Sequence, residues 1–409
     1  MKKHLLAICL LIPALLLGQT KLKGYVTDEE GGIAYATVYI NGSTYGTTTD
    51  TLGYFEIQLS TFPCQLILSH LSYQTQSLQI ESPTAEMLNI KLHPKKIELT
   101  ELNIEDKNLR SENLALFKEL FLGNDYWGVN AILENEDVLT FSYNYYPKKI
   151  RISADTTVHL HPDYQDKILR WAADSSSLWV KEKESFTASA SEALIVDLPL
   201  LGYKIHINLL SFQVYYRFNQ MTSFLGYYYF KPYEMPSKRR QKQYLKKRQE
   251  AYYNSSQHFC RSLWSNTLAQ NGYVLVEKVP RDTLKEETKE QSLLKQSSRA
   301  EDKTPYSLHF LEENLPMYAL SSYEKCIIGQ KDKEYTIMYY PRSDGSPRAL
   351  DKPQKRAISR QSKIRFLSDT CIIHQNGIIP HNMILFGGSM AHKQVGALLP
   401  DDYQLPLAK

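Results

Sequence analysis

The side chains best suited to bind an anion lie in one short stretch of the chain, residues 237–264. We expect this stretch to be helical, with Phe259 on the buried side and with His258 and Arg261 on another side. Guanidinium, imidazole and phenol groups all donate hydrogen bonds to carboxylate or phosphate oxygens. The sequence therefore predicts a small anion-binding site formed by Arg248, Tyr252, His258 and Arg261.

The same stretch contains a histidine and a cysteine, His258 and Cys260, whose residue types could form a nucleophilic pair. Such a pair needs the thiolate within hydrogen-bond reach of the imidazole, but residues two apart on a helix do not face each other. The chain also has no phosphate loop, dinucleotide-binding glycine pattern or Gly-x-Ser-x-Gly turn. We therefore expect no catalytic residue and no cofactor.

A run of positive charge occupies the start of this helical stretch. Seven of the eleven positions from Lys238 to Arg248 are basic, which usually indicates a solvated helix face. The alternative is peripheral attachment of segment 238–248 to anionic envelope surfaces, such as lipid headgroups or lipopolysaccharide phosphates. The residues that helical spacing aligns on this basic surface are Lys238, Arg239, Lys242 and Lys246.

Two pairs of side chains have spacings that zinc ligands also have. His309 and Glu312 lie three residues apart, as in zinc carboxypeptidases, and His159 and His161 would share one face of an extended strand. A zinc site needs further ligands that converge on the same point, and neither pair has a strong one nearby. We expect no metal, and zinc-dependent hydrolase activity is kept as the alternative function.

The first residues have the layout of a secretory signal. Lys2 and Lys3 precede an apolar run that ends near Gly18, and this run is too short to span a membrane comfortably. We expect residues 1–18 to be removed and the rest to be secreted across the inner membrane, to the periplasm or the outer membrane, without a transmembrane span. Nucleic acid is therefore not an expected partner. Without the two lysines the formal charge falls from +4 to +2, so bulk charge indicates no particular ligand.

Cysteines are few and widely spaced after the signal. An exported chain could form one or two disulfides, but no pair has the short spacing of a metal or redox motif, and isolated buried thiols are the favoured interpretation. The sequence does not pair the four residues, which are Cys64, Cys260, Cys326 and Cys371.

The elements that must position these groups are mostly strands. The chain holds 29 tyrosines, and aromatic enrichment is typical of half-buried pleated surfaces. Period-two alternation occurs at residues 33–40 and 54–59, where Phe55, Ile57 and Leu59 share one face. Between these strands, the glycines and Asp50 of "GTTTDTLGYF" predict a turn closed by the Asp50 side chain. A helix is predicted from Ser111, as its cap, to Gly123.

The front of the chain carries a family resemblance. "GYVTD" at 24–28, "ATV" at 36–38, "GTTTD" at 46–50, "GYF" at 53–55 and "LSHLSYQTQSLQI" together resemble the carboxypeptidase-like regulatory domain. The resemblance implies a transthyretin-like β-sandwich over 21–94, without catalytic residues, of the kind that begins many exported proteins of Bacteroidetes. "LLGYKIHINLLSF", "RQEAYYNSSQHFCRSLW" and "LLPDDY" resemble, more loosely, the uncharacterised body that follows this domain in such proteins.

Composition along the chain suggests how the remainder is organised. We expect a β-rich α+β body over 108–279, a charged flexible linker over 280–304 and a β-rich C-terminal segment over 305–409 that packs on the body. The fold class is therefore mainly β. The leading functional expectation is a non-enzymatic, envelope-associated accessory protein that binds envelope proteins or glycans, with peripheral membrane contact as the further alternative.

Overall fold

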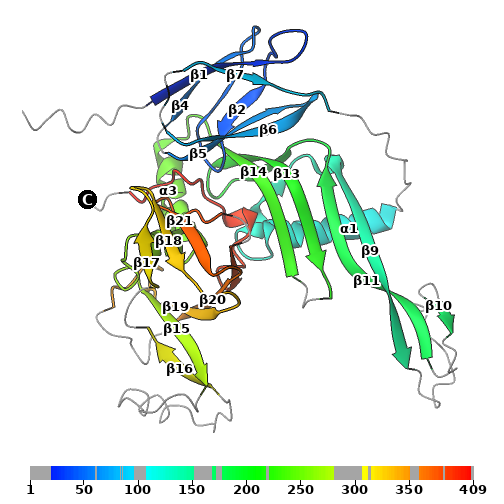
Figure 1. Ribbon diagram of the computed structural model, residues 1–409, viewed down its shortest axis with the longest axis vertical. Coiled ribbons are helices and arrows are strands. Elements are labelled where there is room, and N and C mark those ends of the chain that lie inside the picture. The colour runs from blue at the N-terminus through cyan, green and yellow to red at the C-terminus, as the bar shows by residue number, and fades with distance from the viewer. Residues whose placement is uncertain are drawn as a thin grey trace, which may run out of the picture. The chain divides into compact units, whose positions relative to one another are not determined.

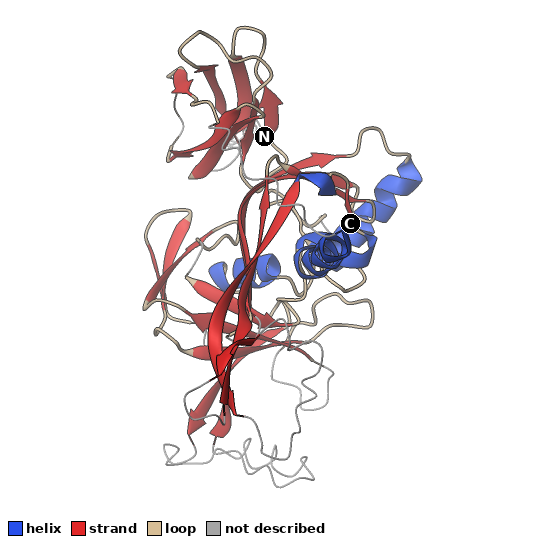
Figure 2. Ribbon diagram, turned by 90° about the vertical axis from the view of Figure 1, so that its right-hand side faces the viewer, coloured by secondary structure: helices blue, strands red, loops and turns tan. Residues whose placement is uncertain are grey.

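The computed structural model describes residues 20–59, 62–82, 84, 86–95, 107–151, 168–171, 177–217, 221–280, 306–311, 315–350, 359–380 and 383–406. Strands dominate these residues (Figures 1 and 2), so the predicted mainly β class is confirmed. The chain forms two compact units. Met1–Leu99, Pro236–His392 and Leu399–Lys409 belong to the first, and Thr100–Met235 and Lys393–Leu398 to the second.

The N-terminal part of the first unit is the predicted β-sandwich. One sheet has the strand order β4-β1-β7 and the other β3-β2-β5-β6. The predicted inward face of β4 is confirmed, because Phe55, Ile57 and Leu59 are buried in the core between the sheets. The strands are β1 (Thr20–Thr27), β2 (Thr37–Ile40), β3 (Gly46–Thr48), β4 (Tyr54–Leu59), β5 (Cys64–His70), β6 (Tyr73–Ile80) and β7 (Leu88–Lys91).

The turn before β4 has the predicted chemistry. The carboxylate of Asp50 accepts hydrogen bonds from the backbone N–H groups of Leu52 and Tyr54, each at 2.9 Å. Gly53 has φ of +80°, a backbone conformation that other residues resist. The stretch is therefore a structural turn that feeds a strand.

The C-terminal part of the first unit combines two helices with two antiparallel sheets of order β16-β15-β19-β20-β22 and β17-β18-β21. Ser237 and Ser255 cap the helices by accepting hydrogen bonds from backbone N–H groups of the first turn. The elements are α3 (Lys238–Tyr252), α4 (Ser256–Trp264), β15 (Tyr273–Pro280), β16 (Tyr306–Phe310), β17 (Met317–Ala319), β18 (Glu324–Ile328), β19 (Glu334–Tyr339), β20 (Arg360–Phe366), β21 (Thr370–His374) and β22 (Ile384–Gly388).

The second unit packs one helix against a seven-stranded sheet. Phe117 and Phe121 of the helix meet Phe212 of the sheet, with centroids 4.8 and 6.1 Å apart. The helix ends before Gly123 as predicted, but it begins at Lys107, so Ser111 lies inside it rather than at its cap. The elements are α1 (Lys107–Leu122), β8 (Ile132–Leu133), β9 (Leu139–Arg151), β10 (Ile168–Trp171), β11 (Ser177–Ala190), β12 (Leu194–Leu198), β13 (Tyr203–Tyr215) and β14 (Met221–Pro232).

The division into units differs from the expected body over 108–279. The boundary lies between Met235 and Pro236, because β15 pairs with β16 and β19 and so joins α3 and α4 to the C-terminal sheets. The expected signal lies outside the described residues, and so does the segment 281–305 that contains almost all of the expected linker.

Candidate functional site

Helix α4 places three of its side chains in the core of the first unit. Phe259 and Leu263 are fully buried, as the helical pattern predicts, and Cys260 is buried beside them. Ser255 sets the start of the helix by accepting a hydrogen bond from the His258 backbone N–H at 3.1 Å.

His258 is buried as well, and the expectation that it lies away from the core is wrong. The Tyr273 hydroxyl lies 2.8 Å from Nδ1, and the Asn271 side-chain oxygen lies 3.4 Å from Nε2. The imidazole also packs against the ring of Tyr252, with centroids 4.9 Å apart. Hydrogen bonds to the side chains of Tyr273 and Asn271 allow this polar ring to stay in the core.

Arg261 leaves the same helix toward the C-terminal tail and the turn after β21. Its guanidinium donates three hydrogen bonds of 2.7 Å, all to backbone carbonyl oxygens, which belong to Asn376, Asp401 and Tyr403. Gly377 allows this close approach, since a Cβ there would lie 2.9 Å from Cγ of Arg261. Arg261 therefore ties three segments that are distant in sequence.

The C-terminal tail, residues 399–403, also contacts the sandwich through the turn between β2 and β3. The Asp401 backbone N–H donates to the Gly42 carbonyl at 2.7 Å. The Asp402 carboxylate accepts hydrogen bonds from the Thr44 backbone N–H at 2.9 Å and from its hydroxyl at 2.5 Å. The tail thus joins the sandwich to α4, and we call this set of contacts the tail clasp.

Asp401 is the most perturbed carboxyl group of the clasp. Burial raises its pKa to about 7, and the negative charge of Asp402 acts in the same direction, whereas Arg261 opposes both. Gly42 leaves room for this carboxylate, because a Cβ on Gly42 would lie 2.0 Å from Oδ2 of Asp401. Sequence reasoning missed both acids as site residues. In the sequence, the two acids are visible only as the Asp-Asp pair in "LLPDDY", one of the stretches that carry the looser family resemblance.

The structure brings together most of the predicted anion-binding residues. The Arg261 guanidinium carbon lies 5.6 Å from the centre of the Tyr252 ring, and that ring meets both His258 and Tyr403. Arg248 instead lies over the ring of Tyr244, at 6.0 Å. The contacts at these residues hold α3, α4 and the tail together, and anion binding by them stays a prediction.

The predicted basic surface lies on the exposed side of α3. Lys238, Arg239, Lys242 and Lys246 are all exposed, whereas Tyr244, Ala251 and Tyr252 are buried. The other side of the helix is therefore packed into the unit.

The metal candidates are not brought together in the part of the chain that the structure describes. His309 is exposed on β16, while Glu312, His159 and His161 lie outside the described residues. Among described side chains, no three His, Cys, Asp or Glu residues gather as metal ligands would.

The four described cysteines are buried free thiols, in agreement with the favoured interpretation, and they are Cys64, Cys260, Cys326 and Cys371. Burial raises the pKa of Cys64 to about 11 and that of Cys371 to about 12. Cys260, which lies beside His258 in the sequence, also has a raised pKa because it is buried. A nucleophilic thiolate needs the opposite shift.

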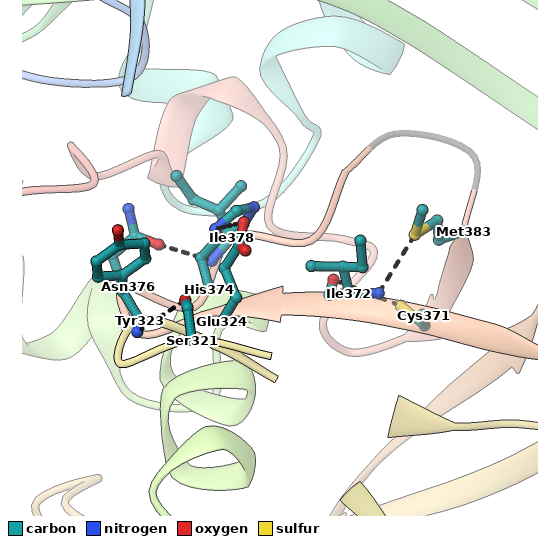
Figure 3. A network of polar contacts seen from close by, with 9 residues as sticks. All are labelled: Ser321, Tyr323, Glu324, Cys371, Ile372, His374, Asn376, Ile378 and Met383. Atoms are coloured by element: carbon teal, nitrogen blue, oxygen red, sulfur yellow. Dashed lines mark hydrogen bonds and ion pairs between the residues drawn. The ribbon is translucent and has the colours of Figure 1, made fainter. Parts of the chain in front are cut away.

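A polar pair that sequence reasoning missed lies between β18 and β21 (Figure 3). Nδ1 of His374 is 3.4 Å from a Glu324 carboxylate oxygen, and the two residues face each other in the strand register. Burial lowers the pKa of His374, and the charge of Glu324 opposes that shift. The one signal in the sequence was the Asn376-Gly377 turn that follows. A small pocket beside the pair is lined by Phe62, Pro63, Tyr323, His374, Gln375 and Asn376.

One end of the sandwich exposes large apolar side chains. Tyr35, Leu52 and Leu71 are 70%, 72% and 64% exposed. The turn that carries Tyr35 packs closely against the turn that carries Leu52. The Tyr35 N–H donates to the Thr49 carbonyl at 3.2 Å. Gly32 approaches the Leu52 backbone so closely that a Cβ on it would lie 2.0 Å from the Leu52 carbonyl oxygen.

The turn that carries Leu71, between β5 and β6, joins the same end of the sandwich through a side-chain contact. The Tyr73 hydroxyl, two residues after Leu71, donates to Asp28 of the turn that follows β1. We call Tyr35, Leu52 and Leu71 the apolar tip. The tip and the tail clasp lie at opposite ends of β2, because Thr37 begins that strand next to Ser69 and the clasp turn follows Ile40.

Residues 22–104 match the family model described as CarboxypepD_reg-like domain. The match covers the sandwich, so the N-terminal part of the chain is a carboxypeptidase-like regulatory domain, as the quoted motifs predict. A comparison with curated proteins gave no match. None of the described helices has the length and hydropathy of a membrane-spanning segment.

Proposed function

We propose that this chain, which begins with a carboxypeptidase-like regulatory domain, is an exported accessory protein of the cell envelope with a non-enzymatic binding role. The apolar tip is the observation that carries the proposal. Three large apolar side chains, held by hydrogen-bonded turns, form a surface that another molecule can cover. The function of the domain is to present this tip to an envelope partner.

The tail clasp supports this role because it fixes the domain at the end opposite to the tip. Gly42 and Thr44 are held by the tail, and the tail is held by Arg261. A binding surface on an anchored domain loses less conformational freedom when a partner docks than one on a free domain. The anchored sandwich therefore holds the apolar tip in a fixed position.

The partner that suits the tip is a protein with a complementary apolar surface. Leu52 and Leu71 offer only hydrocarbon, which contributes to association by leaving water. Tyr35 adds an aromatic ring with a hydroxyl group, a residue type that is enriched at protein interfaces.

Crosslinking in cells tests the proposal. A photoreactive amino acid at position 52 should capture a specific envelope protein, and the double variant Tyr35→Ser/Leu71→Ser should reduce that capture at least tenfold. Met87→Ser is the matched control, because Met87 is also an exposed apolar residue of the sandwich, 50% exposed, but lies outside the tip. Capture that is equal in the tip and control variants contradicts the proposal, as does a chain that stays in the cytoplasm.

A further inference from the structure

Helix α3 presents a basic face that its own unit leaves open. At about 100° per residue, the buried Tyr244, Ala251 and Tyr252 fall on one side, and Arg239 and Lys246 point to the opposite side. Lys238 and Lys242 flank that side. The packed aromatic side fixes the helix, so the four charges are displayed on its open side.

These charges are not neutralised within the described part of the chain. None of the four forms a salt bridge with a described carboxylate, whereas the neighbouring Lys247 pairs with Glu250 at 2.7 Å. Glu250 is the one acidic residue in the helix. The basic face is therefore available to an external anion.

An exposed apolar side chain lies beside the basic face. Leu245 is 44% exposed one turn after Lys242. A helix that combines basic residues with an exposed apolar one can lie in the interface of a bilayer, where the charges meet headgroups and the apolar group enters the acyl boundary. An acidic protein or a free polyanion offers no such environment to Leu245.

We propose that the basic face of α3, together with Leu245, docks on a lipid surface that carries anionic headgroups. Basic side chains near an anionic bilayer each strengthen binding roughly fivefold, and the effect fades within a Debye length. Four such residues together account for about a 10²- to 10³-fold preference over a neutral bilayer. The helix lies parallel to the surface, because the four charges share one side.

This inference rests on the proposed function, because only an exported or membrane-apposed chain would meet such a surface in the cell. The two can fail separately. Vesicle binding of the purified chain tests the docking surface, whereas capture at the apolar tip and localisation in cells test the accessory role.

The test measures sedimentation of the purified mature chain with phosphatidylglycerol vesicles and with phosphatidylcholine vesicles at low salt. Binding to the anionic vesicles alone is expected, together with release at about 0.5 M salt, where the Debye length is short. The variant Lys238→Gln/Arg239→Gln/Lys242→Gln/Lys246→Gln should lose at least 100-fold in affinity. The variant Leu245→Gln should lose a few-fold in affinity and keep its salt dependence.

A matched control removes the same charge from another exposed surface of the unit. The control is Lys278→Gln/Lys331→Gln/Arg342→Gln/Arg360→Gln, four exposed basic residues of the same unit that form no salt bridge with a described carboxylate. It should bind the anionic vesicles within about threefold of the wild type. Equal losses in the two quadruple variants would overturn the proposal. So would binding to polyglutamate that is as tight as binding to anionic vesicles and unaffected by the Leu245 substitution.

Discussion

Replacing Arg261 by alanine separates the two roles that this residue could have. If it holds the tail clasp, its loss destabilises the first unit. If it serves only an anionic ligand, its loss leaves stability unchanged. The structure favours the first outcome, because three guanidinium N–H groups already donate to the carbonyls of Asn376, Asp401 and Tyr403.

The expected loss can be worked from these contacts. A hydrogen bond that involves a charged group contributes about 1.5–3 kcal/mol, and a buried carbonyl left without a donor costs a comparable amount. Arg261 is partly exposed, so water can reach some of the vacated oxygens, and the lower end of the sum applies. We expect Arg261→Ala to lower the free energy of unfolding by about 4–5 kcal/mol. Arg261→Lys should lose somewhat less, because one ammonium group reaches fewer of the three carbonyls.

Urea unfolding of the purified chain measures this loss, and hydrogen exchange locates it. Peptides that cover the tail, residues 399–406, and the β2–β3 turn should exchange faster in Arg261→Ala than in the wild type. Arg239→Ala is the control, since Arg239 is exposed on α3 and its loss should change stability by about 0.5 kcal/mol or less. If Arg261→Ala has the same free energy of unfolding and the same hydrogen exchange in the tail as this control, Arg261 does not hold the tail clasp together.

Four further outcomes follow from the described contacts. Gly42→Ala should cost about 1–2 kcal/mol and loosen the tail in hydrogen exchange, because Gly42 has φ of +76° and faces Asp401. The pKa of Asp401 is raised from 3.8 to about 7, so the free energy of unfolding of the wild type should fall as pH rises from about 4 to 7. Asp401→Asn should flatten this profile. In urea titrations at pH 8 the variant should be more stable than the wild type by about 2 kcal/mol, which is about half the full linkage value. Cys260 and Cys371 should react with maleimide only after unfolding, and labelling of the native chain by mass spectrometry checks this. Purified chain should hold no stoichiometric zinc, and zinc that is lost in His309→Ala would restore the hydrolase alternative.

The sequence by itself determined the elements whose signals are local. Alternation from Tyr54 to Leu59, the Asp50 turn and the burial of Phe259 follow from spacing within a few residues, and the structure confirms each. The spacing of apolar residues and the residue types of a turn act within a single strand or helical turn, so a short stretch of sequence is sufficient to predict these features. The family model matches residues 22–104, where the strand alternation and the Asp50 turn lie.

Only the tertiary structure decided what the polar residues of α4 do. Arg261 meets Asp401 and Tyr403 across about 140 positions of the sequence, and Thr44 meets Asp402 across 358. Helical spacing says which side of α4 a residue is on, but not whether a ligand or another segment of the chain will occupy that side. His258 shows the same limit, because its place in the core depends on Tyr273 and Asn271, which follow after the helix has ended. The packing of the sheets decides which distant segments become hydrogen-bond partners, so these partners cannot be predicted from the local periodicity of the sequence.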